Sequence, residues 1–352
     1  MSAKSDIQWT DATFNPTLGC DYESPGCANC YAVNSVHRMA GNPNVKISNA
    51  NKGLTRLPME GKGGGPRWVG DGRFLAERLA VPVRWREGRR IFVNSLSDLF
   101  LDDFSNEEIA AVFGVMAAAP QHTFQVLTKR AGRLVAWFNW FNEWRHPKRH
   151  IRPALAEHAA VLAEERGHRD VADVLYKAAN KVAGLGDWPL RNVWMGVSVE
   201  SQPYAESRIP MLLRIPAAVH FISAEPLLGP LDLERWMPGG WATGNGCRLC
   251  GFMTSQSNHQ EHCQVPHLQW IIAGGESGNK ARPCHLDWLR GIVRQAKAGG
   301  VPLFMKQLGD WPMGFSGLPA SFGPKGENFE QWPEELRVRE FPKSNHQAGI
   351  FA

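Results

Sequence analysis

Short apolar runs alternate with amphipathic stretches along most of this chain. The apolar runs, rich in β-branched residues, lie at 91–95, 124–128, 192–199, 218–224, 268–275 and 301–306. Stretches with apolar residues at helical spacing lie between them, at 105–118, 203–214 and 285–299. Strands that are separated by helices indicate a parallel sheet, because each parallel pairing needs a crossover connection. With a further strand expected near 13–19, the pattern predicts about seven βα units.

Polar residues follow nearly every predicted strand, as at the carboxyl ends of the strands in a (β/α) barrel. The sequence therefore predicts an α/β fold with a partial, TIM-like (β/α) barrel over 1–310, rather than a doubly wound sheet. The segment 311–352, rich in Pro and Gly, is expected to be an extension packed on the barrel.

Three insertions interrupt the strand and helix pattern. Residues 41–75 are rich in Gly, Asn, Lys and Pro and are expected to form a long exposed loop. Residues 131–187 begin with an aromatic and basic stretch and continue with the spacing of a helical hairpin. Residues 236–267 carry a group of cysteines and histidines, which predicts a small metal-binding insertion.

The composition is that of a folded protein outside the membrane. Of the 352 residues 43% are hydrophobic, and no apolar run approaches the roughly 18 residues that mark a membrane span. The start of the chain lacks the pattern of a secretory signal, so we expect a cytoplasmic protein. The net charge of +5 is compatible with an anionic substrate.

Six of the seven cysteines fall into two tight groups, which favours metal binding over disulfides. The first group is Cys20, Cys27 and Cys30, preceded by Gly19. Three thiolates this close together can hold three irons of a cubane cluster and leave the fourth iron open for a small ligand. A zinc site or a redox-inert cluster is the alternative for the same ligands.

The loop that reads NPTLGC and then GCANCYA, over 15–32, is similar to the cluster loop of radical S-adenosylmethionine (SAM) enzymes. The chain resembles the spore-photoproduct-lyase-like branch and a phage and bacterial family of three-cysteine-motif proteins. Motifs shared with that family lie at 7–20, 94–100, 126–130, 196–200, 225–230, 274–283 and 304–307. The usual radical SAM spacing has three residues between the first two cysteines, whereas this chain has six.

This resemblance implies an enzyme of isomerase or lyase type with a 4Fe-4S cluster on the first cysteine group and SAM at the open iron. A flavodoxin or ferredoxin would supply the electron, and the radical formed from SAM would take hydrogen from a substrate. For a phage-encoded chain in the host cytoplasm, we expect a nucleotide or DNA base as the substrate, such as an amino-acid-substituted thymidine. The alternatives are a lyase that repairs DNA photoproducts and a nucleic-acid-binding protein with structural metal sites.

The polar residues and glycines at the strand ends are the candidate SAM contacts. They are Asp98, Thr128, Lys129, Ser198, Glu200, Glu225, Gly274, Gly275 and Glu276. Carboxylates suit the amine or the ribose hydroxyls of SAM, a cation such as Lys129 or Arg130 suits its carboxylate, and glycines allow close approach. The alternative role of each residue is to tie one loop to the next. Catalytic candidates are Cys284, Lys306 and Glu276, although a packed thiol is the simpler interpretation of Cys284.

The second cysteine group predicts a structural zinc site. Cys247 and Cys250 form a CxxC knuckle, and Cys263 follows with a histidine nearby. His259 is the expected fourth ligand, because His262 adjoins Cys263 and the two would have difficulty reaching one ion. A second iron–sulfur cluster is the alternative.

Cations alternate with aromatic rings at 84–90 and 137–149. Such stretches can bind phosphates and stack on bases. The alternative is a helix whose tryptophans face the core while its basic residues stay in solvent.

Overall fold

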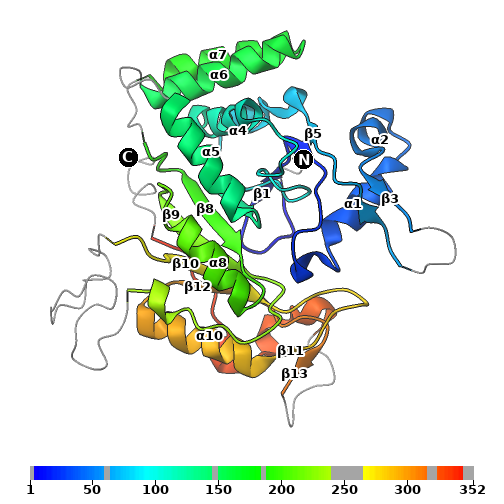
Figure 1. The fold of residues 1–352 in the computed structure, drawn as a ribbon, viewed down its shortest axis with the longest axis vertical. Helices are drawn as coiled ribbons and strands as arrows, with labels where there is room; N and C mark the ends of the chain where they lie inside the picture. Colours follow the sequence, from blue (N-terminus) through cyan, green and yellow to red (C-terminus); the bar gives the residue numbers. More distant parts are fainter. Residues whose placement is uncertain are drawn as a thin grey trace. The chain divides into compact units, whose positions relative to one another are not determined.

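The main element of the fold is a parallel sheet of seven strands, in the order β1-β6-β7-β8-β9-β10-β12 (Figure 1). The computed structural model describes residues 4–58, 64–144, 150–183, 188–238, 265–314 and 323–343. Strand order follows chain order throughout the sheet, as in a (β/α) barrel. This result confirms the predicted α/β class and agrees with a partial (β/α) barrel.

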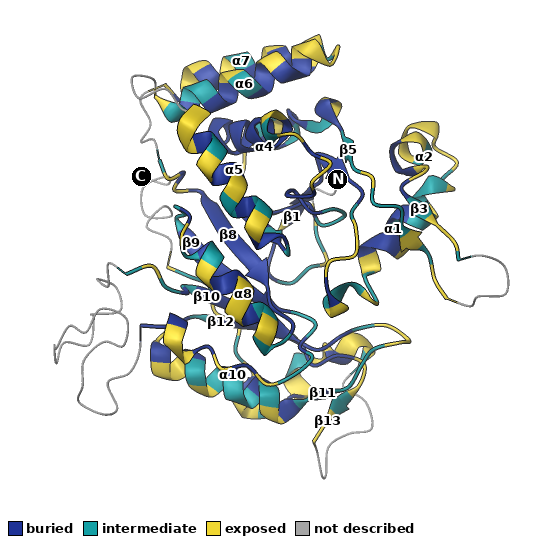
Figure 2. Ribbon diagram, viewed as in Figure 1, coloured by how far each residue is buried: buried dark blue, intermediate teal, exposed yellow. Residues whose placement is uncertain are grey.

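The predicted strands and helices are present close to their expected positions. The strands are β1 Ala12–Phe14, β6 Arg90–Val93, β7 Thr123–Thr128, β8 Val193–Ser198, β9 Val219–Ala224, β10 Trp270–Gly274 and β12 Leu303–Gln307. The predicted amphipathic helices are α4 Asn106–Ala118, α8 Gln202–Leu212 and α10 Leu286–Gly299. β8, β9 and β10 are buried along their whole length, as strands of a parallel sheet covered on both faces should be (Figure 2).

The described residues divide into two compact units, one made of 4–194 and 216–218 and the other of 195–215 and 219–343. In the first unit, β6 pairs in parallel with β1 and with β7. Its helices are α1 Tyr31–Ala40, α2 Val45–Asn51, α3 Val81–Arg84, α4, α5 Ala131–Trp144, α6 Ile151–Glu165 and α7 Arg169–Lys181. α4 packs closely on α6 at Gly114, where there is no room for a side chain. A Cβ atom at this position would lie 2.1 Å from the carbonyl oxygen of Leu155.

The aromatic stretch on α5 belongs to the core of the first unit. Trp137 is fully buried, and its ring stacks on Phe113 at 4.4 Å and on Phe141 at 5.2 Å between ring centroids. Trp137 and Phe141 therefore follow the core-facing alternative, whereas Trp144 at the end of the described part is 37% exposed. In the aromatic and basic stretch at 84–90, the Arg89 guanidinium lies 5.1 Å from the Trp85 ring centre, and Arg90 pairs with Asp11 at 2.8 Å.

The range 41–75 contains regular structure where the sequence predicts a long loop. Besides α2, its described part holds the short strands β3 Thr55–Arg56, β4 Arg67–Trp68 and β5 Arg73–Phe74, and β5 pairs with β2 Thr17–Leu18. The side chain of Asn44 caps α2 by accepting hydrogen bonds from the amides of Lys46 and Ile47. A small apolar cluster, made of Leu18, Val36, Ala50, Leu54 and Leu75, holds these elements on α1. Elements this short show no periodicity that the sequence pattern could reveal.

In the second unit, β10 pairs in parallel with β9 and β12. A further short pair joins β11 Cys284–His285 and β13 Pro312–Met313. The segment 336–341 runs beside β12: the amide of Met305 donates to the Val338 carbonyl, and the Glu340 amide donates to the Leu303 carbonyl, both at 2.8 Å. The free edge of β12 is thus covered by chain from the region predicted as a C-terminal extension. None of the described helices has both the length and the apolar character that a membrane span requires.

Candidate functional site

The first cysteine group lies on one loop between β2 and α1. Cys20 follows β2, Cys27 ends a short 3₁₀ turn, and Cys30 is the N-cap residue of α1. All three carry free thiols and are partly exposed. The structure therefore places the three predicted ligands on one loop that leads into α1.

The surroundings of these sulfurs oppose negative charge unless a cation lies among them. Burial raises the pKa of the Cys20 thiol to about 12, and the charges of Asp98 and of the other two cysteines raise it further, while Arg130 opposes the shift. Burial also raises the pKa of Cys30, although hydrogen bonds from the first amides of α1 and the charge of Lys129 work against it. Three thiolates are stable in such a place when a metal centre supplies positive charge. Three sulfur donors are of the kind that iron–sulfur clusters take as ligands.

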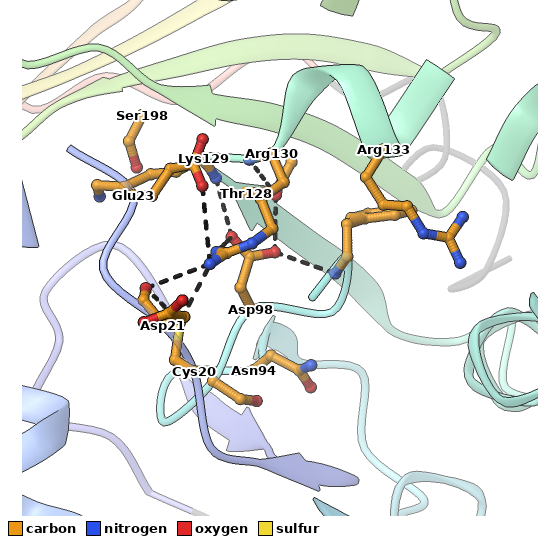
Figure 3. Close-up of polar contacts among 12 residues, drawn as sticks. Cys20, Asp21, Glu23, Asn94, Asp98, Thr128, Lys129, Arg130, Arg133 and Ser198 are labelled. Carbon is orange, nitrogen blue, oxygen red and sulfur yellow. Dashed lines mark hydrogen bonds and ion pairs between the residues drawn. The ribbon is translucent and has the colours of Figure 1, made fainter. Parts of the chain in front are cut away.

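Asp98 joins the loop after β6 to the end of β7 (Figure 3). Its Oδ1 accepts hydrogen bonds from the Thr128 hydroxyl at 2.7 Å and from the Phe100 amide at 3.0 Å. Its Oδ2 accepts from the Lys129 amide at 3.0 Å and from the Arg130 guanidinium at 3.3 Å. Four donors occupy this buried carboxylate, so Asp98 and Thr128 serve here to position the strand ends.

Arg130 links this carboxylate to the cysteine loop. Its Nη1 donates to Cys20 Sγ at 3.8 Å as well as to Asp98, and its Nη2 donates to the Asp21 carbonyl at 3.2 Å (Figure 3). Glu23 lies 3.7 Å from the same nitrogen, and the Arg130 side chain is only 8% exposed. Burial lowers the pKa of Arg130, but the charges of Asp98, Cys20 and Glu23 outweigh it and raise the pKa overall. The sequence singles out Arg130 as a cation at a strand end but gives no sign of its contact with Cys20.

A second polar network, which the sequence analysis missed, connects the first strands to the loop after β6. The Thr17 hydroxyl lies 2.8 Å from that of Ser97 and accepts a hydrogen bond of 2.6 Å from Asn94 Nδ2. Asn15 accepts from the Leu96 amide at 3.0 Å, and Gly19 forms an isolated bridge with Ser97. These contacts fix the residue that directly precedes Cys20.

Gly19 has a backbone that only glycine adopts easily, with φ of +90°, and a side chain there would lie 2.1 Å from the Asp71 carbonyl oxygen. We expect Gly19→Ala to lower the free energy of unfolding by about 2–3 kcal/mol, since it combines backbone strain with a clash. Gly53→Ala is the matched control, because Gly53 has φ of +84° but open space around it. Urea denaturation of both variants measures the difference, and equal losses would contradict the role of the Asp71 contact.

In the second unit, Glu200 is a fully buried carboxylate just beyond β8. Its Oε2 accepts a hydrogen bond of 3.0 Å from Arg208, which also donates to the Ser198 carbonyl at 2.9 Å. Its Oε1 has no hydrogen-bond partner among the described residues. The Arg208 guanidinium stacks over Tyr204 at 4.4 Å from the ring centre. Glu200 is thus held inside the protein by Arg208, with one buried oxygen that has no partner among the described residues.

Glu225 follows β9 and pairs with Lys306 of β12 at 3.0 Å. A side chain at Gly274 would lie 3.1 Å from the same Glu225 oxygen. A side chain at Gly275 would lie 2.2 Å from the Leu308 carbonyl oxygen, so packing of the chain itself requires glycine there. The structure therefore brings Glu225, Lys306 and Gly274 together at the ends of three neighbouring strands.

The other two catalytic candidates have structural surroundings. Glu276 holds Arg282 through two hydrogen bonds of 2.7 and 2.8 Å and also accepts from its amide. Cys284 is 1% exposed, and burial raises the pKa of its thiol to about 12. Both observations favour the loop-tying and packed-thiol interpretations.

The second cysteine group, made of Cys247, Cys250, His259, His262 and Cys263, lies outside the described residues. Within the part of the chain that is described, which includes Cys20, Cys27 and Cys30, no three His, Cys, Asp or Glu side chains form a group that could hold a metal ion. A zinc or cluster site at 247–263 therefore stays a prediction.

The fold and the site together define a mixed α/β protein with a seven-stranded parallel sheet and a three-thiol loop after its first strands. The family described as protein of unknown function (DUF5131) matches residues 4–333, and the chain belongs to this family. No curated protein and no solved structure matches the chain.

Proposed function

We propose that this protein is a radical SAM enzyme in which Cys20, Cys27 and Cys30 hold three irons of a 4Fe-4S cluster. One observation carries the proposal: three free thiols share a loop, and hydrogen-bond donors point at two of them, Cys20 and Cys30. Arg130 donates to Cys20, and the first amides of α1 donate to Cys30. Hydrogen bonds to sulfur are among the means by which proteins stabilise and tune such clusters.

The donor set supports iron–sulfur chemistry over mononuclear zinc. All three groups are soft sulfur ligands, and the acidic neighbours of Cys20 are already engaged. Asp98 is held by four donors, and Glu23 pairs with Arg130. Three thiolates would leave one iron of the cubane without a protein ligand, as SAM binding requires.

Lys129 is the residue proposed to meet the carboxylate of SAM. Its charge lowers the pKa of Cys30, so it lies within electrostatic reach of the cysteine loop. Its backbone is fixed by the hydrogen bond from its amide to Asp98. A bound cluster in its reduced form would supply the electron that splits the sulfonium bond of SAM, while Lys129 would orient the molecule as a point charge.

Anaerobic reconstitution with iron and sulfide tests this proposal. After reduction with dithionite and addition of SAM, chromatography should detect 5′-deoxyadenosine from the wild-type protein. The Cys30→Ala variant, treated identically, is the control. Production of 5′-deoxyadenosine no higher than in this control would overturn the proposal, and a colourless protein containing only zinc would favour structural metal sites instead.

The proposed substrate is the one expected from the sequence, a nucleobase or nucleotide. Trp137 and Phe141 of α5 give it no support, because they are buried in the core, whereas Trp144 of the same helix is 37% exposed. Support comes only from the net positive charge and from exposed cations such as Arg84 and Arg86.

A further inference from the structure

We propose that Arg130 is a positioning residue that sets the reduction potential of the cluster by holding a fixed positive charge against the Cys20 sulfur. This inference rests on the proposed iron–sulfur function and adds to it a determinant of how easily the cluster accepts an electron. The contact between Arg130 Nη1 and Cys20 Sγ, at 3.8 Å, is the observation that carries it.

The guanidinium is held rigidly in place. Both of its terminal nitrogens have protein partners, which are Cys20, Asp98, Asp21 and Glu23. The backbone is fixed as well, because the Arg130 amide donates to the Thr128 hydroxyl at 2.9 Å and Thr128 itself donates to Asp98. A planar fork held at several points keeps its charge at one place, which a flexible ammonium does not.

The charges around Cys20 give Arg130 an effect of definite sign. Asp98 and Glu23 are negative and Arg130 is positive, so the side chains of this trio carry a formal charge of −1 beside the sulfur. Without the guanidinium, the negative charge of Asp98 would act on Cys20 uncompensated, and Glu23 would lose its partner. Reduction adds one electron to the cluster, and a nearby cation stabilises the reduced form while nearby carboxylates destabilise it.

A matched control lies three residues further along the chain. Arg133 lies in the first turn of α5, which Arg130 directly precedes, and it donates to the Phe104 carbonyl at 3.2 Å and pairs with Asp102 at 3.8 Å. It makes no hydrogen bond to the cysteine loop among the described residues. A change at Arg133 therefore tests whether the loss of any arginine near the start of α5 would have the same effect.

The experiment is a redox titration of the reconstituted protein without SAM, followed by electron paramagnetic resonance of the reduced cluster. In Arg130→Met, the ratio of reduced to oxidised cluster at the wild-type midpoint should fall about tenfold, a shift of about 59 mV for one electron. Arg130→Lys should shift less, since it keeps the charge. Glu23→Gln should shift the midpoint in the opposite direction, and Arg133→Met should leave it unchanged.

Equal midpoints in Arg130→Met, Arg133→Met and the wild type would overturn the inference. If Arg130→Met does not take up the cluster, the Glu23→Gln variant decides, because Glu23 is partly exposed and its loss removes only a charge. An unchanged midpoint in Glu23→Gln then overturns the inference, whereas a raised midpoint supports it. Failure of the wild-type protein to take up any cluster would instead refute the proposed function, so the two failures are distinguishable.

Discussion

Replacement of Cys30 by Ala is expected to remove about four irons per chain from the reconstituted protein and to lower SAM cleavage more than about 100-fold. The reason is that Cys30 combines a sulfur ligand with the amides of the first turn of α1, and no neighbouring thiol among the described residues could replace it. The same loss is expected for Cys20→Ala and Cys27→Ala.

Cys284→Ala is the matched control for these variants. It also removes one free thiol, but from a buried site that faces no other cysteine in the described part of the chain. Iron and sulfide analysis before and after the substitution measures the result. Because the second cysteine group can hold metal of its own, the decisive quantity is the difference from the wild type. A difference of one metal ion instead of about four would mean a mononuclear site and would contradict the cluster.

Arg208→Met is expected to lower the free energy of unfolding by about 3–5 kcal/mol. The substitution removes the only hydrogen-bond donor recorded for the fully buried Glu200 side chain in the described residues and leaves its charge uncompensated. Denaturation in urea, with an unchanged slope against denaturant, measures the loss.

The control for this prediction is a surface pair that also involves α8. Arg235 lies 3.8 Å from Glu206, and both side chains are more than half exposed. Arg235→Met should cost less than about 1 kcal/mol, because water screens such pairs. The double change Glu200→Leu and Arg208→Met should recover part of the loss, since it removes both buried charges. Equal effects of Arg208→Met and Arg235→Met would show that burial of Glu200 does not matter for stability.

The strands of this fold are predictable because each is a short, β-branched run between helical patterns. The run at 218–224 became β9 at Val219–Ala224, and the run at 301–306 became β12 at Leu303–Gln307. Burial of whole strands in a parallel sheet leaves such a strong hydrophobic signal. The regular structure within 41–58 depends instead on a helix cap at Asn44 and on a few scattered apolar residues. These residues show no periodicity, so the sequence pattern does not predict the structure.

The residues of the candidate site are predictable from the sequence, but the contacts between them are not. The three cysteines are recognisable from their spacing, and residues such as Asp98 and Arg130 from their place after strands. Their mutual contacts are not predictable, because Cys20 and Arg130 are separated by 110 positions in the chain and meet only through the fold. The same holds for Thr17 and Ser97, 80 positions apart.

The segment 336–341 has a consequence for the solution behaviour of the protein. A parallel sheet that ends on an open strand offers a row of unused backbone donors and acceptors, to which a second chain can add. Here the backbone of 338–340 occupies those groups on β12, the Trp270 indole donates to the Glu340 carbonyl, and Arg339 stacks over Phe304. The family match ends at residue 333, so this cover comes from chain beyond the matched region. A chain that ended at residue 333 would keep all the cysteines proposed to bind metal. It would nevertheless leave the edge of β12 open to pairing with a strand of another molecule.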